Sequence, residues 1–388
     1  MNISTLPVAS VSDLLTLFHG TNEVAAHRVN ALGLPTNKTE QYRFFGIKPL
    51  LAQEYTFIQA DTKEIEEAEY IEIVDGVVLK APKSVHVAYK NARLYNENNF
   101  DVLYHLSHVA AKKVIDITFS EETTSPLRVV HKVSSGLCIY RVALHVEANI
   151  SVSVSEEIEL NADAFALYGY DMQLEEYASL DFIRTQTLDT PCKLLASHNI
   201  DLKRNTNLSL KSYDFGEGNG LHLYTINLDE HATLQTAHLV YLGVDAKEGN
   251  VLHVNHIGKY SKSTQEAKYI LGGGATGIFD GKIMVGEDAQ YTSARQNSKA
   301  MILSRESGVK MVAKPQLEIY TDELEASHGS STGQLDEKEL FYLRSRGIKE
   351  SDAKKMLLLA FANELIEKVK DVQIQQKIKK AFERVHKG

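Results

Sequence analysis

A glycine-rich run from Leu271 to Lys282 has residue types that could bind phosphate, because glycine backbones can approach phosphate groups closely. A phosphate-binding loop needs a Gly-Lys pair followed by Ser or Thr, and here Gly281-Lys282 is followed by Ile283. Three of the glycines also have dinucleotide-binding spacing, but the residues after them alternate as in a strand, where a helix is required. Turns between strands therefore explain these glycines better than a nucleotide site does.

The fifteen histidines form no regular metal-binding array and no His-Glu-x-x-His sequence. His253 and His256 are three apart in a strand-like run, so they should point to opposite faces and not share one metal ion. His105 and His108 are three apart on a predicted helix and could share a face. For each of the four, packing or hydrogen bonding is favoured over metal binding. No Gly-x-Ser-x-Gly elbow supports nucleophilic hydrolysis.

His328 lies in a polar, glycine-bounded segment from Ser327 to Gly333, which we expect to be a turn. A neutral imidazole there could bind a soft or borderline metal, although chemistry alone favours a hydrogen-bonded loop histidine. The only two cysteines, Cys138 and Cys192, are far apart in sequence and form no Cys-x-x-Cys motif. They exclude a disulfide framework and a cysteine-built zinc site, and they indicate a reducing cytoplasm.

Composition narrows the classes of function further. The net charge of −9 argues against general nucleic-acid binding, which needs a basic surface. No apolar run approaches the length of a membrane span, and the N-terminus lacks the pattern of a secretory signal. We therefore expect a cytoplasmic protein that binds neither nucleic acid nor membrane.

The elements that would position these residues divide the 388-residue chain into three parts. Residues 1–113 read as a mixed α/β region, residues 114–333 as short strands, and residues 334–388 as helices. The strands could form a sandwich, a barrel or a solenoid. The pattern apolar-x-Glu-x-Ala-x-apolar favours the solenoid, because its alanines at 178, 232 and 289 are separated by 54 and 57 residues, as the bends of stacked coils would be.

The C-terminal part has signals for two helices. Asp336 and Glu339 have capping-box spacing, Gly347 suits a left-handed end, and Ser351 could cap the second helix. In that helix an apolar stripe repeats every four residues at Leu357, Phe361, Leu365 and Val369. The stripe could pack against the body of the same protein or dock to another chain.

Several short motifs occur along the chain. Those in its C-terminal part are Lys314–Tyr320 (KPQLEIY), Ser327–Gly329 (SHG), Gly333–Asp336 (GQLD) and Leu340–Ile348 (LFYLRSRGI). The supporting motifs upstream are Gly33–Thr36 with Lys38 and Glu40, Gly277–Lys282, Ala289-Gln290 and Ala294–Asn297. Taken together, these motifs resemble the SufB/SufD family, and more closely its SufD branch. The similarity spans nearly the whole chain in the right order.

The resemblance implies a right-handed parallel β-helix flanked by the α/β N-terminal region and the C-terminal helical domain. It also implies a non-enzymatic scaffold role in iron–sulfur cluster assembly, with the cluster bound only transiently in a complex. A SufB-like subunit would pair through the β-helix edge, and a SufC-like ABC ATPase would dock on the C-terminal helices; a homodimer is the alternative for the chain alone. Partner contacts are then expected at Phe341, Arg344, Met356, Leu357, Phe361 and Leu365.

The resemblance also gives His328 the role of a cluster ligand at the subunit interface. The family often has a cysteine two residues earlier, where this chain has Ala326, so a thiolate ligand would come from the partner. The SufB branch would be expected to carry cysteines in its C-terminal half, and none follows Cys192. A β-helix enzyme acting on polysaccharide is the alternative function, although no clustered acids and bases can be picked out to support it.

Overall fold

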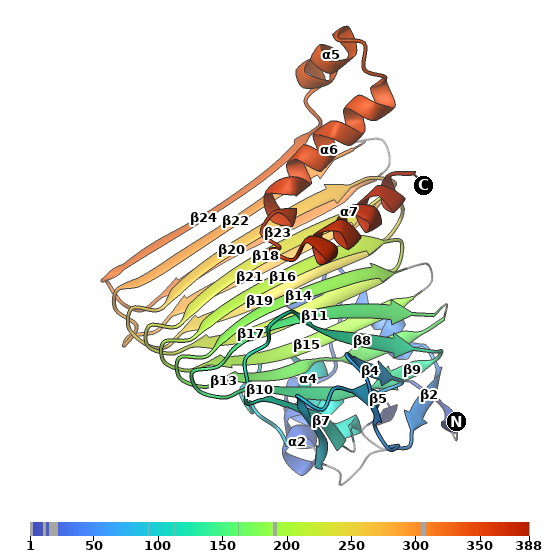
Figure 1. Ribbon diagram of the computed structural model, residues 1–388, viewed down its shortest axis with the longest axis vertical. Helices are drawn as coiled ribbons and strands as arrows, with labels where there is room; N and C mark the ends of the chain where they lie inside the picture. Colours follow the sequence, from blue (N-terminus) through green and yellow to red (C-terminus); the bar gives the residue numbers. More distant parts are fainter. Residues whose placement is uncertain are drawn as a thin grey trace.

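The computed structural model describes residues 3–10, 13–14, 22–91, 93–111, 113–161, 163–188, 192–303 and 308–387. These residues form a parallel β-solenoid of about eight turns with helices at its C-terminal end (Figure 1). The predicted parallel β-helix is therefore confirmed.

Two long sheets form the walls of the solenoid, and each coil adds one level to both. The first wall, here sheet A, contains β7 (Lys113–Phe119), β9 (Leu137–Ile139), β10 (Arg141–Val146), β12 (Phe165–Tyr168), β13 (Tyr170–Leu174), β15 (Lys193–Leu202), β17 (Asn219–Leu228), β19 (Lys247–His256), β21 (Thr276–Val285) and β23 (Lys310–Ile319). The second wall, sheet B, contains β8 (Leu127–Val133), β11 (Ser151–Leu160), β14 (Ser179–Leu188), β16 (Asn207–Gly216), β18 (Thr233–Leu242), β20 (Lys262–Leu271), β22 (Thr292–Ile302) and β24 (Leu324–Gln334).

Apolar residues at every second position fill the interior. Leu180, Leu208 and Leu234 are in register on β14, β16 and β18, and all three are buried. Each such row of like side chains adds apolar area that is removed from water along the solenoid axis, which is the main favourable contribution to its folding. The two-residue period seen in the sequence thus fixes which side chains face inward.

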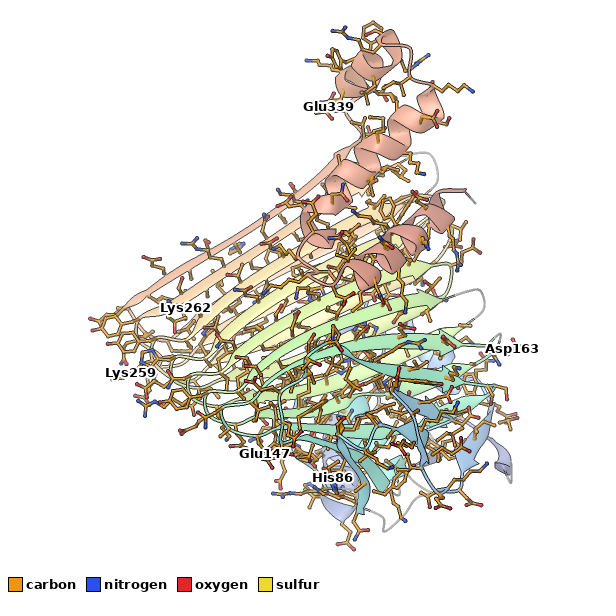
Figure 2. All side chains as sticks on the ribbon, in the orientation of Figure 1. His86, Glu147, Asp163, Lys259, Lys262 and Glu339 are labelled. Atoms are coloured by element: carbon orange, nitrogen blue, oxygen red, sulfur yellow. The ribbon has the colours of Figure 1, made fainter. Side chains whose placement is uncertain are left out.

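The turn that leads from sheet A to sheet B has the same backbone conformation in successive coils. One residue adopts a left-handed conformation there, and the set is Asn149, Tyr177, Asn205, His231, Tyr260 and Tyr291. His231, Tyr260 and Tyr291 stack with ring centroids 4.9 Å apart. Figure 2 shows Lys259 and Lys262 at this turn. Ala178, Ala232 and Ala289 are fully buried close to these bends, which explains the spacing found in the sequence, since each interval spans two coils.

The N-terminal region is joined to both walls. Its elements are β1 (Ile3–Ala9), α2 (Glu23–Leu32), η2 (Glu40–Tyr42), α3 (Ile47–Ala52), β2 (Tyr55–Ala60), β3 (Glu66–Glu67), β4 (Ile71–Val74), β5 (Val77–Ala81), β6 (His86–Asn91) and α4 (Val102–Ala110). Strand β2 pairs with β9 of sheet A, and β4 pairs with β8 of sheet B. The region therefore closes one end of the solenoid.

Three helices follow the last strand: α5 (Glu337–Ser345), α6 (Glu350–Ile366) and α7 (Val372–Lys387). Asp336 caps α5 by accepting from the backbone N–H groups of Lys338 and Glu339, as predicted. The prediction that Ser351 caps α6 is wrong: the N-cap position is Lys349, and the acidic first turn of α6 suits the positive end of the helix dipole without a side-chain cap. Among the described helices, none is long and apolar enough to cross a membrane.

Candidate functional site

His328 lies in the middle of β24, the last strand of sheet B, where it is in register with Gln296 of β22. The expectation that Ser327–Gly333 forms a turn is wrong. Pairing with β22 supplies the backbone hydrogen bonds of this Ser- and Gly-rich segment, so it forms a strand without the apolar alternation that marks the buried strands. The His328 side chain is exposed, and its imidazole is available to a partner.

A cavity of about 470 Å³ lies beside His328. It is lined by polar and charged residues of β20, β22 and β24 and by Glu364 of α6. In the part of the chain that the structure describes, His328 belongs to no group of three metal-ligating side chains. Ala326 is two residues away in the same strand and offers no ligand atom. The chain can thus supply one imidazole at this point, and further cluster ligands would have to come from elsewhere.

Both walls of the solenoid end in an open edge at this same end (Figure 1). Among the described strands, β23 pairs only with β21, and β24 pairs only with β22. An edge strand presents unpaired N–H and C=O groups, which are a template for adding a further strand. Apolar side chains are also exposed here, with Ile319 44% and Tyr320 58% accessible.

The C-terminal helices place the six predicted partner-contact residues in two different settings. Phe341, Arg344 and Met356 are exposed, with Phe341 72% accessible, and they lie on α5 and the first half of α6, which project away from the solenoid in Figure 1. Leu357 and Phe361 are half-buried, and Leu365 is fully buried. The second half of the apolar stripe is therefore used within the chain, against sheet B.

A lysine of sheet B holds this second half of α6. Lys268 of β20 donates to the carbonyl of Phe361 at 2.7 Å, forms an ion pair with Glu364, and lies over the Phe361 ring. Tyr213 of β16 donates to the Leu365 carbonyl at 2.7 Å. The base of α6 is thus fixed to strands that lie two and four levels below His328.

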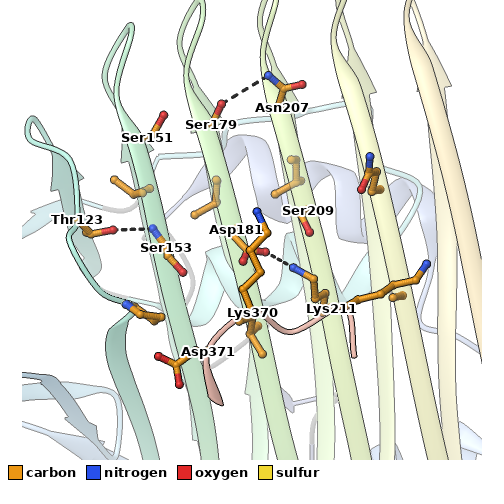
Figure 3. A pocket seen from close by; sticks show the side chains of 18 of the residues that line it. Thr123, Ser151, Ser153, Ser179, Asp181, Asn207, Ser209, Lys211, Lys370 and Asp371 are labelled. Atoms are coloured by element: carbon orange, nitrogen blue, oxygen red, sulfur yellow. Dashed lines mark hydrogen bonds and ion pairs between the residues drawn. The ribbon is translucent and has the colours of Figure 1, made fainter. Parts of the chain in front are cut away.

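A groove of about 970 Å³ lies on the outer face of sheet B, beside the turn between α6 and α7 (Figure 3). Hydroxyl and amide side chains of successive strands line it, including Ser151, Ser179 and Asn207. Two of its carboxylates form ion pairs, Asp181 with Lys211 and Glu266 with Lys368. The third, Asp371, accepts hydrogen bonds from the backbone N–H groups of Gln373 and Ile374 at the start of α7. Paired carboxylates of this kind do not favour the polysaccharide-cleaving alternative, which needs a free acid and a free base.

The other histidines singled out in the sequence are engaged within the fold. His105 contacts the Asn99 carbonyl at 2.9 Å, and His108 lies 3.2 Å from Asp171. His253 stacks on Phe100, whereas His256 faces inward between two serine hydroxyls, so the two point to opposite faces as predicted. Cys138 and Cys192 are both buried, and burial raises the pKa of the Cys138 thiol.

The sequence interpretation missed a polar network inside the solenoid. Arg184 of β14 binds both oxygens of Asp214 of β16, with nitrogen–oxygen distances of 2.8 to 3.3 Å. His222 of β17 and Glu248 of β19 lie beside this pair, and all four residues are buried. The sequence could have indicated this network, because it places charged residues at inward-facing positions of otherwise apolar strands. Arg184, for example, lies an even number of residues from Leu180, Phe182 and Leu188, so it faces the same side of β14 as they do.

Glu156 of β11 belongs to the same interior. Its Oε1 accepts from the Tyr168 hydroxyl at 3.1 Å and lies 3.2 Å from His131 Nε2. Burial raises the pKa of Glu156 to about 7, although the positive charge of Arg184 opposes the shift. Burial also lowers the pKa of His131 to about 3, so this imidazole is neutral.

The chain is thus a β-solenoid with a closed interior, two open sheet edges and two projecting helices. The family model described as "SUF system FeS cluster assembly, SufBD core domain" matches residues 129–361. The chain belongs to this SufBD family.

Among curated proteins, the chain is 23% identical over 376 residues to the iron–sulfur cluster assembly protein SufD of Escherichia coli, covering 89% of this chain and 88% of that protein. It is 25% identical over 169 residues to SufD of Bacillus subtilis, covering 43% and 38%. It is 29% identical over 213 residues to a SufBD family protein of Synechocystis, covering 54% and 46%.

Proposed function

We propose that the chain is a non-catalytic scaffold subunit of a cytoplasmic Suf machine, which pairs with a SufB-like subunit and docks a SufC-like ATPase. One observation carries the proposal: both sheets end in open edges at the same end of the solenoid, and His328 stands on one of them. The solenoid of a second subunit can continue both sheets there, and His328 then lies at the interface between the two subunits. The iron–sulfur cluster is assembled at this subunit interface and passed on, and the partner supplies its remaining ligands.

The projecting α5 and the first half of α6 are the proposed ATPase contact. Phe341, Tyr342 and Met356 are 72%, 57% and 50% accessible, which is unusual exposure for large apolar side chains on neighbouring elements. Motion of the docked ATPases would move α6, and Lys268 would transmit it to β20, two strands from His328. In this mechanism, ATP hydrolysis by the SufC-like partner opens the interface with the SufB-like subunit, where the cluster is bound.

Co-purification with the two partners from the same organism tests both contacts separately. Ile319→Asp with Tyr320→Asp should release the SufB-like subunit, whereas Ile257→Asp, on an equally exposed side chain at a corner, should not. Phe341→Asp with Met356→Asp should release the ATPase, whereas Val372→Asp should not. Retention of both partners by the edge and helix variants, with folding unchanged by circular dichroism, would refute the proposed contacts.

A further inference from the structure

The solenoid interior holds a group of metal-ligating side chains far from the open edges. Asp214, His222 and Glu248 come from β16, β17 and β19, and their ligand atoms all lie within 4.8 Å of one another. Each of the three residues is at most 2% accessible. Two carboxylates and one imidazole are a donor set that suits divalent first-row transition metals.

Acceptor atoms in this group have capacity left for a cation. Glu248 Oε1 is buried and, within the described part of the chain, has no hydrogen-bond partner. Asn250, in register with His222 on the adjacent strand, is also buried, and among the described residues its Oδ1 has none either. An unpaired buried acceptor destabilises the folded state, and a bound cation would remove that cost.

The backbone makes room for the Glu248 carboxylate. Gly220 is in register with Glu248, and a Cβ at Gly220 would lie 2.2 Å from Glu248 Oε2. Gln186 bridges two of the candidate ligands: its Oε1 is 2.9 Å from His222 Nε2, and its Nε2 is 3.1 Å from Glu248 Oε2. The Gln186 amide therefore occupies the position between imidazole and carboxylate that an ion would take, and its oxygen is itself a metal donor.

Arg184 forms an ion pair with Asp214 in this structure, so Asp214 could bind a metal ion only if Arg184 moved to another partner. Arg184 Nη1 also donates to His222 Nδ1 at 2.6 Å. A second carboxylate is available to it, because Glu156 is in register with Arg184 on the next coil. Glu156 Oε2 is buried and, among the residues described, has no hydrogen-bond partner. Turning to Glu156 would keep Arg184 paired while freeing Asp214.

We propose that Asp214, His222 and Glu248 bind one divalent first-row transition metal ion inside the solenoid, and that Arg184 turns from Asp214 to Glu156 when the ion enters. The charges balance in this state: the ion is matched by Asp214 and Glu248, and Arg184 is matched by Glu156. The absence of a sulfur ligand in the group favours Mn²⁺, Fe²⁺, Co²⁺ or Zn²⁺ over Cu⁺.

A row of polar side chains extends from the open end into the interior as far as β18, and Leu210 of β16 is next in register. Gln296, Gln265 and Thr236 follow His328 in register on β22, β20 and β18. All three are buried, and each has a polar atom without a hydrogen-bond partner in the described structure. Polar groups of this kind can hydrogen-bond buried water, whereas the apolar rows around them cannot.

Direct metal binding by the purified full-length chain tests the proposal. After chelator treatment, the protein is dialysed against Mn²⁺ or Zn²⁺ and its metal content is measured. One ion per chain is expected, with affinity lowered by about tenfold or more in Glu248→Gln and Asp214→Asn. Glu176→Gln and Glu325→Gln are matched controls, which should bind as the wild type does, because both glutamates are exposed and lie outside the group.

The outcomes separate the parts of the proposal. No binding by the wild type, or equal binding by Glu248→Gln with unchanged thermal unfolding, would overturn it and leave Arg184 as the permanent counter-charge of Asp214. Loss of the ion in His328→Ala alone would move the site to the solenoid edge and equally overturn it. Glu156→Gln keeps every ligand, so weaker binding in that variant is expected if Arg184 must turn, and unchanged binding would refute that movement.

Discussion

Replacing Glu156 by Gln should change how the stability of the solenoid depends on pH. Glu156 is fully buried, and burial raises its pKa from 4.5 to about 7 against the opposing charge of Arg184. The folded state therefore holds this proton more tightly than the unfolded state does. The resulting stability is fully present below pH 4.5 and is lost as the pH rises through 7.

The size of the effect follows from the shift. One pKa unit corresponds to about 1.4 kcal/mol, so the shift from 4.5 to about 7 corresponds to roughly 3 kcal/mol of unfolding free energy. Glutamine keeps the shape but does not titrate. Relative to the wild type, Glu156→Gln should gain stability steadily from pH 5 to pH 8.

Urea unfolding followed by circular dichroism at several pH values measures this difference. Glu325→Gln is the matched control, because Glu325 is an exposed glutamate on β24, and its stability should stay parallel to that of the wild type. If the Glu156→Gln and wild-type midpoints also differ by a constant amount across this range, the raised pKa of Glu156 is wrong.

Two other substitutions test the packing of the coils and of α6. A Cβ at Gly169 would lie 1.7 Å from the Ser197 carbonyl oxygen, so Gly169→Ala should lower the unfolding free energy by about 3 kcal/mol or more, whereas Gly333→Ala, with nothing within 4 Å, should change it by less than about 0.5 kcal/mol. Equal melting temperatures would contradict this. Lys268→Met removes the ion pair with Glu364 and the bond to the Phe361 carbonyl, so hydrogen exchange in α6 should become faster while exchange in β14 and β16 stays unchanged; unaltered exchange in α6 would exclude Lys268 as its anchor.

The regular features of the fold could be predicted from the sequence because they depend on local periodicity. Alternating segments such as Ile150–Ser155 and the recurrent alanines at 178, 232 and 289 point to stacked strands with repeated bends. The Asp336 cap followed from its own chemistry. In each case the determining residues are close together in the chain.

The features that escaped prediction depend on contacts between distant residues. β24 has no apolar alternation, and its structure comes from its register with β22. Arg184 and Glu156 would be surface residues in most strands, and only the closed interior brings them together. The buried face of α6 is set by Tyr213 and Lys268 of sheet B. The proposed role of His328 rests on family resemblance, since its own sequence context favoured an ordinary loop histidine.

Cluster assembly on the purified three-protein complex tests the central claim most directly. The complex with wild-type chain or with His328→Ala is supplied anaerobically with iron and sulfide, and the absorption of the assembled cluster is recorded. His145→Ala, at a partly buried histidine on β10 in the other wall of the solenoid, is the control. The account predicts that His328→Ala leaves the complex intact but lowers the amount of cluster, while His145→Ala does not. Equal cluster formation by all three complexes would contradict it.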